Sequence, residues 1–305
     1  MSAMFNESVL LFTFVIGVVG FVFGAIRNGA VLRGLESAGL AIAGSLIARA
    51  LVVLLLTLGH PSPGRSIIIG WAFFLWPGAI DSIAWLLKHK LLLTGPTVLP
   101  WIASGVGAVI GIMDGAYRIH GWPWGIATFL VDVTWGLAGS TNGALLHLAN
   151  IGWGKHAEDG RSGAHRYASG FRMKTDYAFT QGSVMSDLAD APGSPLWNHE
   201  RTHVRQNRYF GPFYSLTYIA WLVLWVIPGL IAGAVTGVGV GEGAQRWCYF
   251  NCPWEAWGYS VQKASRPSVA GDGRLIWPNI AVVAAAIPFF AGVVSLLLVT
   301  FLKLW

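Results

Sequence analysis

The sequence predicts a mainly α-helical, polytopic membrane protein with about six transmembrane helices, one re-entrant or interfacial hairpin, and a small α+β insert at the membrane surface. Of its 305 residues, 54% are hydrophobic and only 11% are charged, which is too apolar for an ordinary soluble domain. Several apolar runs have about the 20 residues that a helix needs to cross a bilayer. A polar stretch between two such runs carries histidine and glutamate at a spacing typical of a metal site.

Charge and aromatic content indicate contact with lipid. The net charge of +6 is better interpreted as membrane topology and lipid-surface contact than as a nucleic-acid surface. Many of the 16 tryptophans lie near the ends of the apolar runs, as an aromatic belt requires. We therefore expect membrane lipid and no nucleic acid as partners. The two cysteines, Cys248 and Cys252, have a spacing that suits a metal site or a local bridge, but we interpret them as semi-buried thiols.

Residues 1–153 form a region of five predicted spans, namely 9–26, 38–58, 67–87, 98–113 and 124–151. The first is a transmembrane helix and not a signal peptide, because no basic residue precedes it and no small-x-small cleavage site follows. The fourth contains Gly105, Gly107 and Gly111, and such small residues allow helices to approach closely.

Four ionisable side chains fall within these spans: Arg49, Asp81, Asp132 and His147. Such groups are costly at membrane depth, so each marks either a function or a pairing. We favour buried ion pairs or hydrogen bonds that hold the bundle together over a proton or ion pathway. His147 as a metal ligand is a weaker alternative, because it lies on an apolar segment far from the metal motif.

Residues 154–196 are the main extramembrane insert, rich in charged residues, glycine and serine. Between positions 171 and 179 apolar residues alternate with others, which predicts a strand; its alternate members are Phe171, Met173, Thr175, Tyr177 and Phe179. A turn at 181–183 and a second short strand at 184–185 complete a hairpin. The hairpin covers the metal helix, or its edge receives an extended peptide by strand addition, and both can hold.

The metal motif is H-E-x-x-H at His199, Glu200 and His203. On a helix, residues four apart lie on one face, so both imidazoles can reach one ion while Glu200 lies beside them as a general base. A catalytic zinc takes three protein ligands and keeps one position for water. Glu255, in a segment that can begin a helix at Pro253, is the predicted third ligand.

From Tyr167 to Tyr259 the chain resembles the gluzincin zinc metallopeptidases, in which a glutamate on a later helix completes H-E-x-x-H. The resemblance implies a zincin-like insert with Zn²⁺ as cofactor. Many gluzincins carry an aspartate four residues after that glutamate, where this chain has Tyr259, a phenol that can hydrogen-bond to an imidazole but supplies no charge. Tyr259, Tyr209 and Arg205 are alternative donors to the oxyanion.

Topology constrains the third ligand. The positive-inside rule puts the metal motif at the cytoplasmic face, since only Arg65 and Arg118 among the loop cations fall on the other side. Glu255 reaches the same side only if 210–240 enters and returns, so we predict a re-entrant or interfacial hairpin broken at Pro228-Gly229. If 210–240 spans instead, the third ligand comes from the insert: Asp187, Asp190 or His165.

The sequence thus divides into a five-helix membrane region (1–153), a metal-site region (154–278) and a last span in 279–305. The leading hypothesis is a zinc endopeptidase that cleaves a peptide or membrane-protein segment near the bilayer. A zinc-stabilised scaffold, as a subunit of a larger membrane assembly, is the alternative. A transporter that uses Arg49, Asp81 and Asp132 is the third hypothesis.

Overall fold

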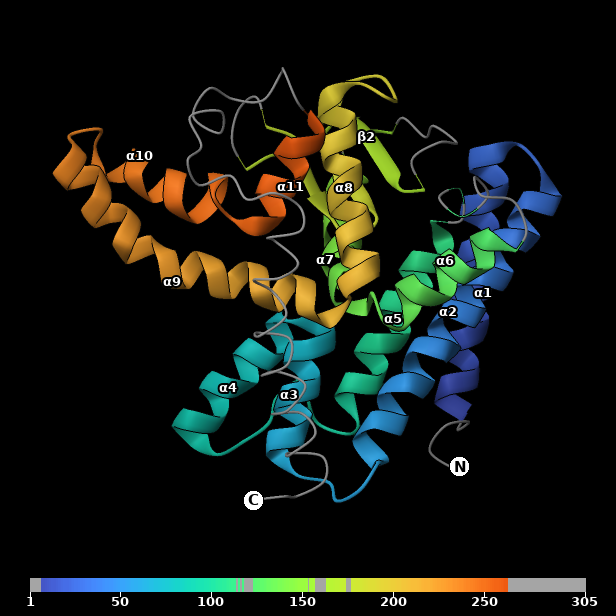
Figure 1. Cartoon of the computed structure of the whole chain (residues 1–305). Coiled ribbons are helices and arrows are strands. Elements are labelled where there is room, and N and C mark those ends of the chain that lie inside the picture. The colour runs from blue at the N-terminus through green and yellow to red at the C-terminus, as the bar shows by residue number, and fades with distance from the viewer. Residues whose placement is uncertain are drawn as a thin grey trace.

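The computed structural model describes residues 7–113, 115, 117, 123–152, 154–156, 163–173 and 177–262. This part of the chain is mainly helical with one small sheet (Figure 1). Three of its helices are long and apolar enough to cross a membrane: α1 (Glu7–Asn28), α2 (Val31–Thr57) and α9 (Pro212–Thr236). They are consistent with an integral membrane protein. The count of six spans and the side of the metal motif stay predictions, and the last predicted span lies outside the described residues.

Helices α1, α2 and α5 (Val98–Ile112) pack side by side through small residues. A Cβ atom on Gly44 or on Gly107 would overlap the backbone of the other residue, and one on Gly111 would overlap the backbone at Ala41. Two of the three glycines predicted to allow close packing therefore do so. Gly105 does not, because a Cβ atom there would meet open space.

Two predicted spans are each divided into two helices. The third predicted span becomes α3 (Pro63–Phe74) and α4 (Trp76–Lys88), which separate at Leu75 with φ 67° and ψ −74°. Pro77 has no N–H and its ring opposes continuation of α3, while Gly78 allows α4 to pack against Trp71. The fifth becomes α6 (Trp124–Val133) and α7 (Leu137–Asn150). The prediction of continuous spans was wrong at both places.

The sheet has the strand order β1-β2-β4-β3, so β3 is an edge strand. Its members are β1 (Lys155–His156), β2 (His165–Ser169), β3 (Phe179–Gln181) and β4 (Val184–Ser186). β2 and β4 are parallel, whereas β3 and β4 form the antiparallel hairpin predicted around the turn at Gly182, where φ is +55°.

The long strand predicted over 171–179 was wrong at the positions that the structure describes, 171–173 and 177–179, except at its end, because of these only Phe179 lies in a strand. The backbone at Phe171 is bound by side chains instead: its N–H donates to Asn150 Oδ1 at 2.7 Å, and its carbonyl oxygen accepts from Ser186 Oγ at 2.6 Å. With these groups satisfied, the backbone of Phe171 needs no strand partner. Thr175 lies outside the described residues.

The metal helix α8 (Pro195–Phe210) leads into α9 across Gly211, and in Figure 1 α9 then extends away from the rest of the molecule. The predicted break at Pro228-Gly229 was wrong, because α9 is helical through Pro228. The chain reverses later, at Gly237 (φ 73°) and Gly239 (φ 97°). α10 (Val240–Ala244) and the π-helix η3 (Gln245–Phe250) return along α9, so that α11 (Pro253–Gln262) packs against α8. The predicted return therefore occurs around a different turn.

The buried charges bind structural partners. Asp81 accepts hydrogen bonds from the N–H groups of residues 92–94 and from the hydroxyl of Thr94, and so fixes the segment after α4. Asp132 on α6 binds Arg208 on α8 through two hydrogen bonds of 2.9 and 2.8 Å. The guanidinium of Arg49 lies over the ring of Trp101. These contacts match the predicted role of holding the bundle together.

Candidate metal centre

The metal motif lies on the buried face of α8. The helix begins at a serine cap, where the Ser194 hydroxyl accepts the N–H of Trp197, and Pro195 occupies the first turn, where its missing N–H costs nothing. His199, Glu200 and His203 are only 2%, 5% and 6% exposed. The apolar residues of α8 pack into the core, so the buried face of the helix is fixed and the two imidazoles project together.

Glu255 joins the two histidines from α11. The Nε2 atoms of His199 and His203 are 3.0 Å apart. Glu255 Oε2 lies 3.3 Å from His199 Nε2, and Glu255 Oε1 lies 3.5 Å from His203 Nε2. Tetrahedral ligands at zinc distances of 2.0–2.1 Å are about 3.4 Å from one another. The three side chains therefore lie close enough together to hold one metal ion.

The polar atoms of this cluster agree with that fit. Glu255 Oε2 is buried and accepts no hydrogen bond within the described part of the chain. Burial alone would raise the pKa of Glu255, but the charge of His203 and the close approach of both imidazoles hold it well below its usual range. Burial likewise lowers the pKa of His203, but the Glu255 carboxylate outweighs it and raises that pKa to about 9. The Glu255 carboxylate is thus ionised, and it stabilises a positive charge on the neighbouring imidazole.

Gln206 orients His203. Its amide nitrogen donates to the carbonyl oxygen of Trp254 at 2.9 Å, which leaves its oxygen to accept the Nδ1–H of His203 at 2.9 Å. In the neutral imidazole Nδ1 therefore carries the proton, which leaves the lone pair of Nε2 for a metal ion. Because Trp254 precedes Glu255 on α11, the same glutamine joins both helices that carry ligands. Tyr214 of α9 also lies 3.3 Å from His203 Nδ1 through its hydroxyl oxygen.

Two further contacts fix the other ligands. The hydroxyl of Tyr218 on α9 donates to Glu255 Oε1 at 2.9 Å. The ring of Tyr259 packs edge-on against His199, with 4.5 Å between ring centroids. Gly258 lies on the same imidazole, and a Cβ atom there would come within 2.8 Å of it. Tyr259 thus contacts a ligand through its ring, whereas the predicted contact was a hydrogen bond from its phenol to an imidazole.

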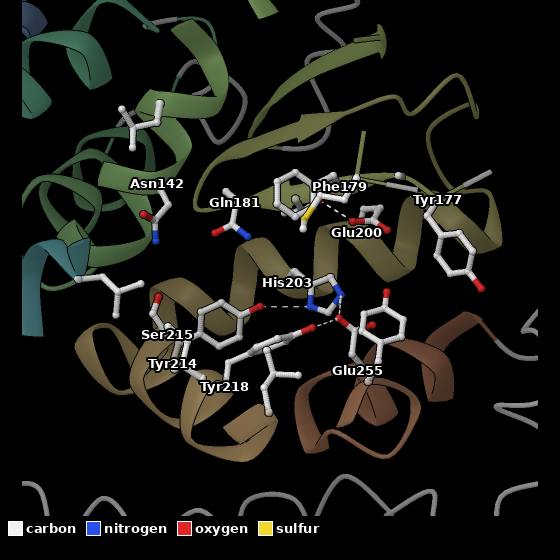
Figure 2. Close-up of a pocket in the computed structure, with 18 of the residues that line it drawn as sticks. Asn142, Tyr177, Phe179, Gln181, Glu200, His203, Tyr214, Ser215, Tyr218 and Glu255 are labelled. Carbon is white, nitrogen blue, oxygen red and sulfur yellow. Dashed lines mark hydrogen bonds and ion pairs between the residues drawn. The ribbon is translucent and has the colours of Figure 1, made fainter. Parts of the chain in front are cut away.

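Glu200 faces a cavity of about 670 Å³ between the sheet, α7, α9 and η3. Thr180 on the edge strand β3 donates its hydroxyl to Glu200 Oε2 at 2.6 Å. In Figure 2, Glu200, His203 and Glu255 lie between Tyr177 at one end and Asn142 at the other. A bound molecule can therefore reach the carboxylate and the metal ligands at the same time.

Several predicted site residues lie elsewhere. Arg205 is exposed and Tyr209 is 65% exposed, because positions two and six beyond His203 turn to the outer face of α8. Neither can act as an oxyanion donor in this cavity.

The alternative third ligands are also away from the cluster. His165 Nε2 bonds to the carbonyl oxygen of Met113, and Asp187 pairs with Arg172. Asp190 is exposed and its carbonyl oxygen binds Arg166. Of the residues expected to receive substrate, Met173, Tyr177 and Phe179 line the cavity.

The residues that form hydrogen bonds to the metal ligands and to Glu200 were not predicted from the sequence. Gln206 stands three positions after His203, so the helical period could have revealed it. Tyr214 and Tyr218 stand in a run that was interpreted only as apolar. Thr180 lies on β3 and contacts Glu200 of α8, and the spacing of residues within one element does not predict a contact between two elements.

Comparison with protein-family models, with curated proteins and with solved structures gave no match. The functional argument therefore depends on the chemistry of the cluster and its cavity.

Proposed function

We propose that this protein is a membrane-embedded, zinc-dependent endopeptidase, with His199, His203 and Glu255 as metal ligands and Glu200 as general base. The observation that carries the proposal is the donor set: two imidazole nitrogens and a carboxylate, 3.0–3.5 Å apart, beside a cavity. Two histidines and a carboxylate are a recurrent ligand set of catalytic zinc. Zinc bound there polarises a carbonyl group and lowers the pKa of its water to about 7.

The protein side chains have separate roles in this reaction. Glu200 takes the proton of the attacking water and later gives it to the leaving amine. The hydroxyl of Thr180 holds one carboxylate oxygen of Glu200, which fixes its direction. Gln206 and Tyr218 hold His203 and Glu255 in the orientation that ligation requires.

The position of α9 supports a substrate near the membrane. One face of α9 lines the cavity with Tyr218, Ile219 and Leu222. Another face exposes Val223, Leu224 and Ile227, which suits contact with lipid. A single helix thus separates the cavity from this apolar surface, and the proposed substrate is a peptide or membrane-protein segment close to the bilayer.

The test is zinc content and peptide cleavage of the detergent-purified chain, unaltered and as Glu200→Gln. General-base loss should lower turnover by about 10²–10⁴-fold while one zinc per chain is kept. Glu242→Gln is the matched control, since Glu242 pairs with Arg246 at the surface and should leave both values unchanged. His203→Ala and Glu255→Ala should lose zinc. Zinc retained without Glu255 contradicts the ligand set.

The same variant separates the rival hypotheses. A metal-stabilised scaffold in a larger assembly keeps its function in Glu200→Gln and shows no cleavage at any stage. A transporter keeps its flux after zinc is removed. The transporter hypothesis needs free intramembrane charges, but Asp81 is bound by backbone N–H groups and Asp132 by Arg208.

A further inference from the structure

The end of the cavity beyond the metal ligands contains two amide side chains. Asn142 comes from α7 and Gln181 from the end of the edge strand β3, and both line the cavity. Figure 2 shows them on the same side of His203, with Ser215 of α9 below them. Two elements that are distant in sequence thus present the same chemical group to one space.

Within the described part of the chain, no side-chain hydrogen bond joins the amide of Asn142 or of Gln181 to another residue, and both residues are only partly buried. The other amides around the site are engaged: Gln206 binds His203 and Trp254, and Asn207 donates to the carbonyl oxygen of Gly136. A primary amide offers both a donor and an acceptor, which complements the N–H and C=O of a peptide group. The free amides therefore favour a bound peptide backbone.

The walls around the amides are apolar. Leu75, Leu145, Ile219 and Leu222 line the cavity from the α3–α4 junction, α7 and α9. The backbone of Leu75 has φ 67°, a conformation that is strained for a non-glycine residue and persists where the surroundings enforce it. At Leu75 the chain passes from α3 to α4, and this residue lines the cavity where α3, α7 and α9 contact one another.

We propose that this end of the cavity is the specificity site for a large apolar side chain of the peptide substrate, with Asn142 and Gln181 bound to the adjacent backbone. The inference rests on the proposed function and adds a substrate class to it. An acyl chain would fill the apolar walls but would leave both amides unpaired, at a cost in affinity. A charged side chain would lose its hydration against four leucine and isoleucine side chains. A peptide with leucine or phenylalanine near the scissile bond satisfies both features.

The experiment uses peptide hydroxamates, which bind zinc without turnover, measured by calorimetry on the zinc-loaded full chain in detergent. Ligands of one backbone carry leucine, alanine or lysine, and a fourth replaces the amide beside leucine by an ester. We expect the leucine ligand to bind at least tenfold more tightly than the alanine or lysine ligand, as burial of its additional methylene groups implies. We also expect it to bind more tightly than the ester.

Variants test which side chains cause the preference for leucine and which cause the preference for the amide over the ester. Leu222→Gln should remove the preference for leucine over lysine, whereas Leu224→Gln, two positions along α9 on its exposed face, should keep it. Asn142→Leu combined with Gln181→Leu should remove the difference between amide and ester and leave the affinity for acetohydroxamate unchanged. Equal binding of all four ligands by the unaltered chain overturns the proposal. Loss of acetohydroxamate binding in the double variant overturns the assigned role of the amides.

Cleavage of the matching peptides separates this inference from the proposed function. Cleavage without preference for leucine leaves the peptidase standing and overturns the specificity site. Hydroxamate preference without any cleavage leaves the specificity site standing and overturns the peptidase. A chain that binds no hydroxamate overturns both.

Discussion

Replacing Gln206 by methionine tests whether the orientation of His203 sets metal affinity. Methionine keeps the length of the side chain but cannot accept the Nδ1–H of His203 or donate to the carbonyl oxygen of Trp254, both at 2.9 Å. Loss of a group that orients a ligand lowers metal affinity by about 10–100-fold. The buried carbonyl oxygen left without its donor costs a further ~1–3 kcal/mol of folding stability.

Gln206→Glu is the matched control for this substitution. Its carboxylate still accepts the proton of His203 but cannot donate to Trp254, so it should keep zinc affinity better than methionine while losing comparable stability. Zinc affinity is measured by competition with a chelator, and stability by thermal unfolding in the same detergent. Unchanged zinc affinity in Gln206→Met would refute the argument that the glutamine fixes the tautomer and direction of the imidazole.

Three further predictions address the fold around the site. Gly258→Ala places a Cβ atom within 2.8 Å of His199 and should lower zinc occupancy, measured by elemental analysis; full occupancy would contradict this. Asp132→Asn leaves the buried Arg208 without its charge partner and should destabilise the chain by about 3–5 kcal/mol in thermal unfolding. In the metal-free chain the pKa of His203 is raised to about 9, so its stabilising contribution is complete below about 6.5 and lost as pH rises to 9. The melting temperature in chelator should fall over that window, and His203→Gln should show a flatter profile.

The sequence predicted those parts of the site that depend on local helical geometry. His199, Glu200 and His203 share one face because their spacing on a helix requires it. Glu255 was chosen from the downstream acidic residues because its segment could begin a helix at Pro253. The structure brings it to the histidines as that argument required.

The fold was predicted less well where backbone conformation depends on contacts distant in sequence. A run of apolar residues from 67 to 87 has the hydropathy of a span, but the packing of Gly78 against Trp71 divides it at Leu75. Alternation over 171–179 resembled a strand, whereas Asn150 and Ser186 bind the backbone at Phe171. Pro228 predicted a break, but the loss of its one N–H did not end α9. The chain reverses instead at Gly237 and Gly239, which have positive φ.

The hairpin of α9, α10 and η3 lies between the histidine ligands and Glu255, so a metal ion bound by all three would act as a cross-link. It would close a loop of the 51 residues from 204 to 254. In the chain-entropy view, closing a loop of that length restricts the unfolded chain by about 4 kcal/mol. Before the ion binds all three ligands, the hairpin must already have folded back, because Glu255 reaches α8 only at the end of that path. Binding of the ion by all three ligands would therefore be a late step in the folding of this chain and would occur only after the hairpin has formed.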